Sequence, residues 1–258
     1  MRYAAAVCLA VSLTLPTSLS AQTIAPPPRA PVTAGTADPA RTTTNFWAPF
    51  TQIPDDLVRF LSADTLKILA VGGAGAAAAH RWDGKGIEEA REHLRPGLFE
   101  AGNIAGGVLV QTGAAFGLYS VAKLAGSNQF AAVGADLVRS QVLSQAIVQA
   151  GKFTTRRSRP DGSNSHSLPS GHTASAFATA TVLQQHFGWK VGVPAYGFGA
   201  YVAASRMSAN KHHLSDVLLG AAIGVAAGRT VTIGTGSTRF DVGVAPTMGG
   251  AAVTFTKR

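Results

Sequence analysis

From about residue 55 onward, apolar positions recur in long segments rich in Ala, Gly, Val and Leu. These segments are too long for single strands, and their length favours helices. The expected helices cover residues 56–79, 100–124, 129–152, 170–187, 191–206 and 213–229. The short connections at 126–128 and 188–190 predict antiparallel neighbours. The sequence therefore predicts an all-α fold, an antiparallel bundle of about six helices.

The pattern changes after Arg229, where apolar residues begin to alternate with other residues. Phe240, Val242 and Val244 follow this period of two, as do Val253 and Phe255. Such alternation is typical of strands, and residues 246–250 would form the turn between them. We expect a small C-terminal β-hairpin within a tail that covers residues 233–258.

The N-terminal part of the chain has the features of an export signal followed by a spacer. A basic start, an apolar run and small residues up to Ala21 predict a signal peptide over residues 1–21. The alternative is a membrane anchor, for which the run is short. Residues 22–55 are rich in Pro, Ala and Thr, which indicates a flexible spacer before a helical domain at 56–232. We expect an exported protein, periplasmic or extracellular.

Composition narrows the classes of function. The 258 residues are 46% hydrophobic and 14% charged, with a formal charge of +9 and one cysteine. A disulfide framework and a thiolate metal cluster are excluded, and the positive charge indicates anionic partners. The glycine-rich helices are compatible with a soluble or surface-associated bundle and also with a membrane-embedded one.

In an alternating bundle, the connections after the first, third and fifth helices lie at the same end. These connections are residues 80–95, 151–169 and 206–212, which hold most of the unusual polar residues of the chain. The sequence therefore predicts that the chemistry of this protein is located at one end of the bundle.

Three polar clusters lie at that end. The first, residues 152–160, carries four cations within eight residues, among them Lys152 and Arg159, and this crowding predicts a nearby anion unless it is a solvated helix end. In the second, Ser170 is a candidate N-cap, and Gly171 allows an anion to approach the first amides of a helix. His172 follows in the first turn, where it would lie beside a bound anion.

The third cluster contains Arg206, His212 and Asp216. His212 and Asp216 are four residues apart, which places them on one helical face. A carboxylate beside an imidazole fixes its tautomer and stabilises its cation. An ordinary surface pair and a pair of metal ligands are the alternatives, and the metal reading lacks further ligands at suitable spacing.

Together these motifs, K-x6-R-P, P-S-G-H and S-R-x5-H-x3-D, resemble the type 2 phosphatidic acid phosphatase superfamily, which includes bacterial nonspecific acid phosphatases and vanadium haloperoxidases. The resemblance covers residues 60–230 and implies two-step, metal-independent hydrolysis of phosphomonoesters without a cofactor. It implies a nucleophilic His212 that forms a phosphohistidine, Asp216 as its orienting carboxylate, and His172 as the acid and base. The phosphate would be held by cations and by backbone amides: Lys152, Arg159, Arg206, Ser170 and Gly171.

The expected substrate is a phosphorylated lipid or a small phosphomonoester, and membrane association is compatible with the apolar helices. A vanadate-dependent haloperoxidase is an alternative, since the same residues can hold vanadate. The charge also permits a non-enzymatic binder of anionic membranes. Nucleic acid is not an expected partner, because the chain has an export signal and lacks aromatic residues interleaved with basic ones.

Overall fold

The computed structural model describes residues 46–93, 96–233, 240–247 and 250–257. The predicted signal peptide lies outside the described residues, as does most of the predicted spacer. The last part of that spacer is helical, because the segment 46–55 already contains α1 and the start of α2. The helical structure therefore begins before residue 56, the boundary expected from composition.

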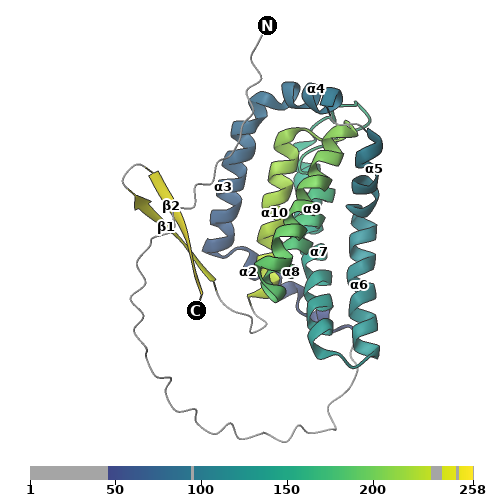
Figure 1. Cartoon of the computed structure of the whole chain (residues 1–258), viewed down its shortest axis with the longest axis vertical. Helices are drawn as coiled ribbons and strands as arrows, with labels where there is room; N and C mark the ends of the chain where they lie inside the picture. The colour runs from purple at the N-terminus through teal and green to yellow at the C-terminus, as the bar shows by residue number, and fades with distance from the viewer. Residues whose placement is uncertain (1–45, 94–95, 234–239, 248–249, 258) are drawn as a thin grey trace, which may run out of the picture. The chain divides into compact units, whose positions relative to one another are not determined.

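Ten α-helices and one short 3-10 helix are present in the described residues, so the expected count of six is wrong. Their bounds are α1 Ala48–Thr51, α2 Ile53–Phe60, α3 Ala63–Ala79, η1 His80–Trp82, α4 Asp83–His93, α5 Pro96–Ala105, α6 Val108–Leu124, α7 Asn128–Thr155, α8 Gly171–Phe187, α9 Trp189–Ser208 and α10 Leu214–Thr232 (Figure 1).

Two breaks in expected helices and two additional helices, α1 and α4, account for the difference in number. The first expected helix is broken at Ser62, whose hydroxyl accepts a hydrogen bond from the Thr65 amide and caps α3. The second is broken at 106–107, between α5 and α6. In addition, the charged connection 80–95 is helical over η1 and α4. The sequence predicted no helix there because this segment lacks an apolar stripe.

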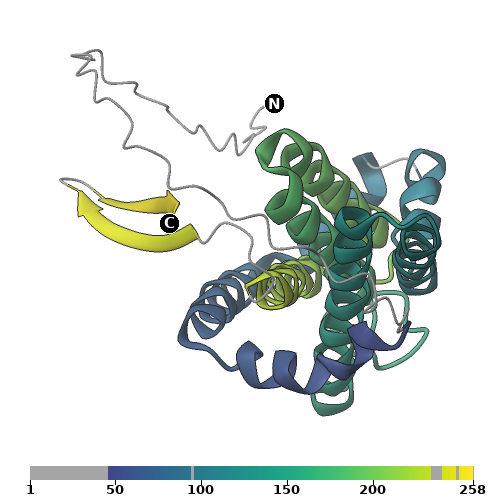
Figure 2. The ribbon, with the colours of Figure 1, turned by 90° about the horizontal axis from the view of Figure 1, so that it is seen from below.

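The helix α10 lies at the centre of the packing and contacts α3, α7 and α8 (Figure 2). Glycines on α10 allow the close approach to α8: a Cβ at Gly220 would lie 2.5 Å from the Ser170 carbonyl oxygen, and one at Gly224 would lie 2.3 Å from the Ala174 carbonyl oxygen. Because Ser170 and Ala174 belong to the start of α8, this contact fixes the position of the helix terminus that carries the candidate site.

A buried network of charged residues connects α2 with α7 and α8. Arg139 is 1% exposed and donates to Asp56 at 2.7 and 2.5 Å and to Asp136 at 2.9 Å. His186 also contacts Asp136, with 2.9 Å between Nε2 and Oδ2. Each buried charge is thus paired, as burial of ions requires.

The described residues beyond the helices form strands β1 Phe240–Thr247 and β2 Gly250–Lys257. The strands pair antiparallel, with Phe240 opposite Lys257 and Thr247 opposite Gly250. Pro246 belongs to β1 and Gly250 to β2, whereas the sequence predicted both residues in the turn.

Candidate active site

The three polar connections meet, as the alternation of helices predicted. Arg157, in the connection after α7, forms a 2.6 Å ion pair with Asp83 at the start of α4. Asp161 in the same connection pairs with Lys211, which follows α9, at 2.5 Å. The Asp161 amide also donates to the Asn210 carbonyl at 3.1 Å. Segments far apart in the sequence therefore form one polar end.

Three cations predicted for phosphate binding come from three elements. Lys152 lies in the last turn of α7, Arg159 in the following connection and Arg206 in the last turn of α9. Burial, together with repulsion from Arg159 and Arg206, lowers the pKa of Lys152. Burial and repulsion from Arg159 lower the pKa of Arg206 to about 10. The structure thus brings the three cations close enough to repel one another.

Arg206 is a buried guanidinium with a donor that is free to bind an anion. It is 9% exposed, and its Nη1 donates to the Asn103 side chain of α5 at 2.8 Å. Its Nε is buried with no hydrogen-bond partner, and the same is true of the Arg159 Nε. Buried donors without partners are costly, and a bound oxyanion would satisfy them.

The residues Ser170 and Gly171 open α8 as expected, but Ser170 differs in detail. Ser170 is the N-cap residue, and its amide already donates to the Asp216 carbonyl at 3.0 Å. Its hydroxyl contacts the Thr173 hydroxyl at 3.0 Å. The first intrahelical hydrogen bond runs from the Ala174 amide to the Ser170 carbonyl, so the amides of residues 171–173 are the ones placed to meet an anion.

The geometry of His212 differs from the predicted helical pair. The helix α10 begins at Leu214, so His212 lies outside it, and Asp216 accepts from the His213 amide at 2.8 Å. The His212 Nδ1 lies 2.7 Å from the Ser167 carbonyl oxygen and 3.7 Å from the Asp216 Oδ2. The prediction of one helical face was therefore wrong, although the two side chains are close.

These contacts fix the tautomer of His212. A carbonyl oxygen only accepts hydrogen bonds, so Nδ1 carries the proton and Nε2 has a free lone pair when the ring is neutral. His212 is 1% exposed. Burial lowers the pKa of His212, and Arg206 and Lys152 lower it further, whereas Asp216 raises it. The neutral imidazole is the favoured form.

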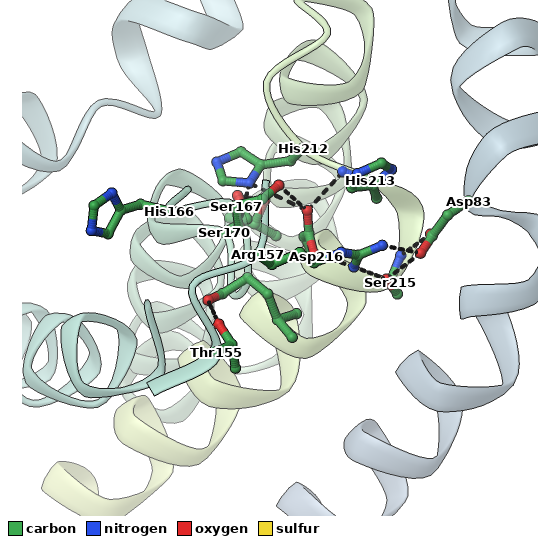
Figure 3. A network of polar contacts seen from close by, with 12 residues as sticks. Asp83, Thr155, Arg157, His166, Ser167, Ser170, His212, His213, Ser215 and Asp216 are labelled. Carbon is green, nitrogen blue, oxygen red and sulfur yellow. Dashed lines mark hydrogen bonds and ion pairs between the residues drawn. The ribbon is translucent and has the colours of Figure 1, made fainter. Parts of the chain in front are cut away.

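The Asp216 carboxylate is fully buried and receives several donors (Figure 3). Oδ2 accepts from the Ser167 hydroxyl at 2.5 Å and Oδ1 from the Arg157 Nη1 at 2.6 Å. Burial raises the pKa of Asp216, but hydrogen bonds and the Arg157 charge outweigh it, and the net shift is downward. The residue is a carboxylate at neutral pH.

His172 lies in the first turn of α8, where the sequence placed it. Burial lowers the pKa of His172 to about 3, aided by repulsion from Arg206, His212 and Lys152. The second imidazole therefore lies within the field of the cations and of His212, and it is neutral in the free protein above that pH.

Sequence reasoning missed four contributors to this end of the bundle: Asp83, Arg157, Ser167 and Ser215. Asp83 and Ser215 form a polar network with Arg157, and the Ser167 carbonyl holds His212. Arg157 stood among the four cations of its cluster, but the motif spacing selected its neighbour Arg159. The contacts of the other three come from residues far apart in the sequence, for which the chain carries no local signal. Within the described ranges, no group of three or more His, Cys, Asp or Glu residues could hold a metal ion.

Comparison with known proteins agrees with the motifs. Residues 134–237 match the family model described as the PAP2 superfamily. Over this stretch the chain is similar to the PAP2 superfamily. The matched range contains the predicted site residues of all three motifs, and the resemblance inferred from them is confirmed.

One curated relative and two solved structures resemble this chain. The lipid A 1-phosphatase of Porphyromonas gingivalis is 43% identical over 89 residues, which cover 33% of this chain and 20% of that relative. The crystal structure of Aquifex aeolicus LpxE gives a TM-score of 0.46 at 20% identity, covering 56% of this chain and 91% of that one. A transmembrane PAP2 type phosphatidylglycerolphosphate phosphatase from Bacillus subtilis gives 0.40 at 18%, covering 72% and 94%.

Two parts of the described chain have the length and composition to cross a membrane. One is α10, although 67% of its apolar window is buried in the protein, as in the core helix of a soluble bundle. The other is the pair Gly97–Ala105 and Val108–Leu124, bent by 51°, if it counts as one span.

Proposed function

We propose that this protein is a metal-independent phosphomonoesterase that acts through a phosphohistidine on His212. The observation that carries the proposal is the commitment of the His212 Nδ1 proton to the Ser167 carbonyl, at 2.7 Å. This contact leaves Nε2 as the nucleophilic atom, in the electrostatic field of Arg206 and Lys152. Phosphoryl transfer requires mainly positioning and charge stabilisation, which this arrangement supplies.

In the first step, the Nε2 lone pair of His212 attacks phosphorus and the bond to the leaving oxygen breaks. His172 donates a proton to that oxygen. A bound phosphate offsets the repulsion from the cations, so the pKa of His172 rises when substrate binds. In the second step, His172 accepts a proton from water, the water oxygen attacks phosphorus, and inorganic phosphate leaves with His212 restored.

The substrate class that we propose is a phosphorylated lipid, with small phosphate esters as poorer substrates. Large apolar side chains are exposed along α6, among them Leu109 at 88% and Leu124 at 78%. Exposed apolar surface of this kind supports contact with a membrane or with lipid. The relative from Porphyromonas gingivalis, which is 43% identical to this chain over 89 residues, is named lipid A 1-phosphatase. We therefore propose an exported, membrane-associated enzyme.

The test is a panel of phosphate esters, with and without detergent micelles, on the wild type and on His212→Ala. We expect loss of hydrolysis in His212→Ala and an acid-labile phosphoenzyme in the wild type alone. His213→Ala is the matched control, because it removes the neighbouring imidazole and leaves the proposed nucleophile in place. Vanadate should inhibit the wild type, and EDTA should have no effect. Full hydrolysis by His212→Ala would refute the assignment.

A further inference from the structure

A continuous chain of polar contacts leads from α4 to the carboxylate beside His212. The Arg157 Nη2 donates to the Asp83 Oδ2 at 2.6 Å, and the Arg157 Nη1 donates to the Asp216 Oδ1 at 2.6 Å. Asp83 is 5% exposed and Asp216 is fully buried. Arg157 thus lies between two buried carboxylates, one on α4 and one on α10 (Figure 3).

Ser215 completes this network from the start of α10. Its hydroxyl contacts both the Arg157 Nη1, at 2.6 Å, and the Asp83 Oδ2, at 2.7 Å. Its amide donates to the Asp83 Oδ1 at 2.9 Å. Asp83 therefore holds Arg157 and the first turn of α10 together, and the guanidinium has little freedom to leave Asp216.

The consequence concerns the charge that Asp216 presents to His212. The Oδ1 atom carries the ion pair with Arg157, while Oδ2 accepts from Ser167 and from the His213 amide. A carboxylate with this set of donors attracts a proton on a neighbouring imidazole less strongly than a carboxylate without them. The 3.7 Å separation between the His212 Nδ1 and the Asp216 Oδ2 is consistent with that weaker pull.

We propose that Arg157, held in place by Asp83, is a positioning residue that moderates the charge of Asp216 and so keeps His212 neutral and nucleophilic. The inference rests on the proposed function, since it assigns the state of the proposed nucleophile. It also gives α4 a role: Asp83, the first residue of that helix, is connected to the site through the Arg157 guanidinium and through Ser215.

Several other groups also shift the pKa of His212, and the effect of Arg157 adds to theirs. Asp216 raises the pKa of His212, and Arg206, Lys152 and burial lower it. His172 is a second imidazole that interacts electrostatically with His212, and it is neutral above about pH 3. At the outer end of the network, His80 contacts Asp83 at 2.8 Å, but its side chain is 68% exposed and solvent screens its charge.

The experiment compares the pH dependence of kcat/KM in the wild type, Arg157→Gln and Asp83→Asn, using a soluble aryl phosphate. Arg157→Gln leaves the Asp216 charge uncompensated, so the acid limb should move to higher pH by about one unit. Asp83→Asn lets the Arg157 charge bear more strongly on Asp216, so the acid limb should move to lower pH. Arg157→Lys retains the charge and should keep the wild-type limb at a reduced kcat.

Arg139→Gln is the matched control, because Arg139 also pairs with two buried carboxylates. It precedes Lys152 by 13 residues on α7, which corresponds to about 20 Å of helix. This variant should lose stability without moving the acid limb. The titration of the His212 ring, followed by NMR in isotope-labelled protein, should show the same shifts without any turnover.

Acid limbs that coincide in the wild type, Arg157→Gln and Asp83→Asn would overturn the inference. If Arg157→Gln fails to fold, the direction of the shift in Asp83→Asn decides. Failure of the proposed function would have a different signature, because a wild type that hydrolyses no phosphate ester fails before any variant is compared. If the wild type is active and the acid limb of kcat/KM lies at the same pH in all three proteins, the role of Arg157 is refuted and the proposed function stands.

Discussion

The contact between α10 and α8 makes a quantitative prediction about Gly224. A Cβ at this position would lie 2.3 Å from the Ala174 carbonyl oxygen, 2.8 Å from the Phe177 Cβ and 2.9 Å from the Ala178 amide nitrogen. Two of these three atoms belong to the backbone of α8, so no side-chain rotation can relieve the overlap. In Gly224→Ala the two helices must therefore move apart.

The expected magnitude is the difference between two terms. Overpacking in a tight core costs about 1–3 kcal/mol. Replacing glycine by alanine within a helix gains about 1 kcal/mol from the intrinsic propensity. The net expected loss of unfolding free energy in Gly224→Ala is about 0–2 kcal/mol, which corresponds to a fall in Tm of up to about 8 °C for a domain of this size.

The assay is thermal unfolding of the wild type and variants in the same buffer or detergent. Gly75→Ala is the matched control: Gly75 lies within α3, and a Cβ there meets nothing within 4 Å. Its Tm should rise by about 1–4 °C, because only the propensity term remains. If Gly224→Ala also raised Tm, the close approach of α10 to α8 would be refuted.

Three further side chains, Arg206, His172 and Arg156, each have a measurable effect. Arg206→Met should lower kcat/KM by about 100-fold or more, because it removes a buried donor to the proposed phosphate, whereas Lys123→Met on α6 should not; equal activities would contradict the placement of Arg206. The pKa of His172 lies at about 3 in the folded state, below its ordinary value of 6.5, so its contribution to stability should be present above pH 6.5 and lost as the pH falls toward 3; denaturation curves at pH 7 and pH 4 should show a smaller acid loss in His172→Asn. Arg156 ends α7 with φ at 46°, so Arg156→Gly should raise Tm by relieving left-handed strain, and Arg156→Ala should not.

Much of the site could be predicted from the sequence because its residues stand in short motifs. Lys152 and Arg159 are separated by fixed local spacing, and the same is true of His212 and Asp216. The order of the motifs, the small residues that open α8 and the alternation of helices together predicted a single polar end. Each of these inferences depends on the chemistry of neighbouring residues or on the up-and-down alternation of helices, and both can be derived from the sequence.

Other features were not readable because they depend on the exact ends of helices. The interval of four residues between His212 and Asp216 suggested one helical face. In the structure α10 begins only at Leu214, and the Asp216 side chain accepts from the His213 amide. Spacing alone does not distinguish a helical pair from a residue that precedes the helix and one in its first turn. The same uncertainty concealed the breaks that raise the number of helices.

The sequence by itself determined the residue types of the site, their order and the end of the bundle at which they meet. Only the tertiary structure decided which group contacts which. The Ser167 carbonyl, 45 residues from His212, accepts a hydrogen bond from its Nδ1, and Asp83, 74 residues from Arg157, holds that guanidinium on Asp216. Contacts of this separation are set by how closely α10 packs against its neighbours, and no local pattern encodes the distance between two helices.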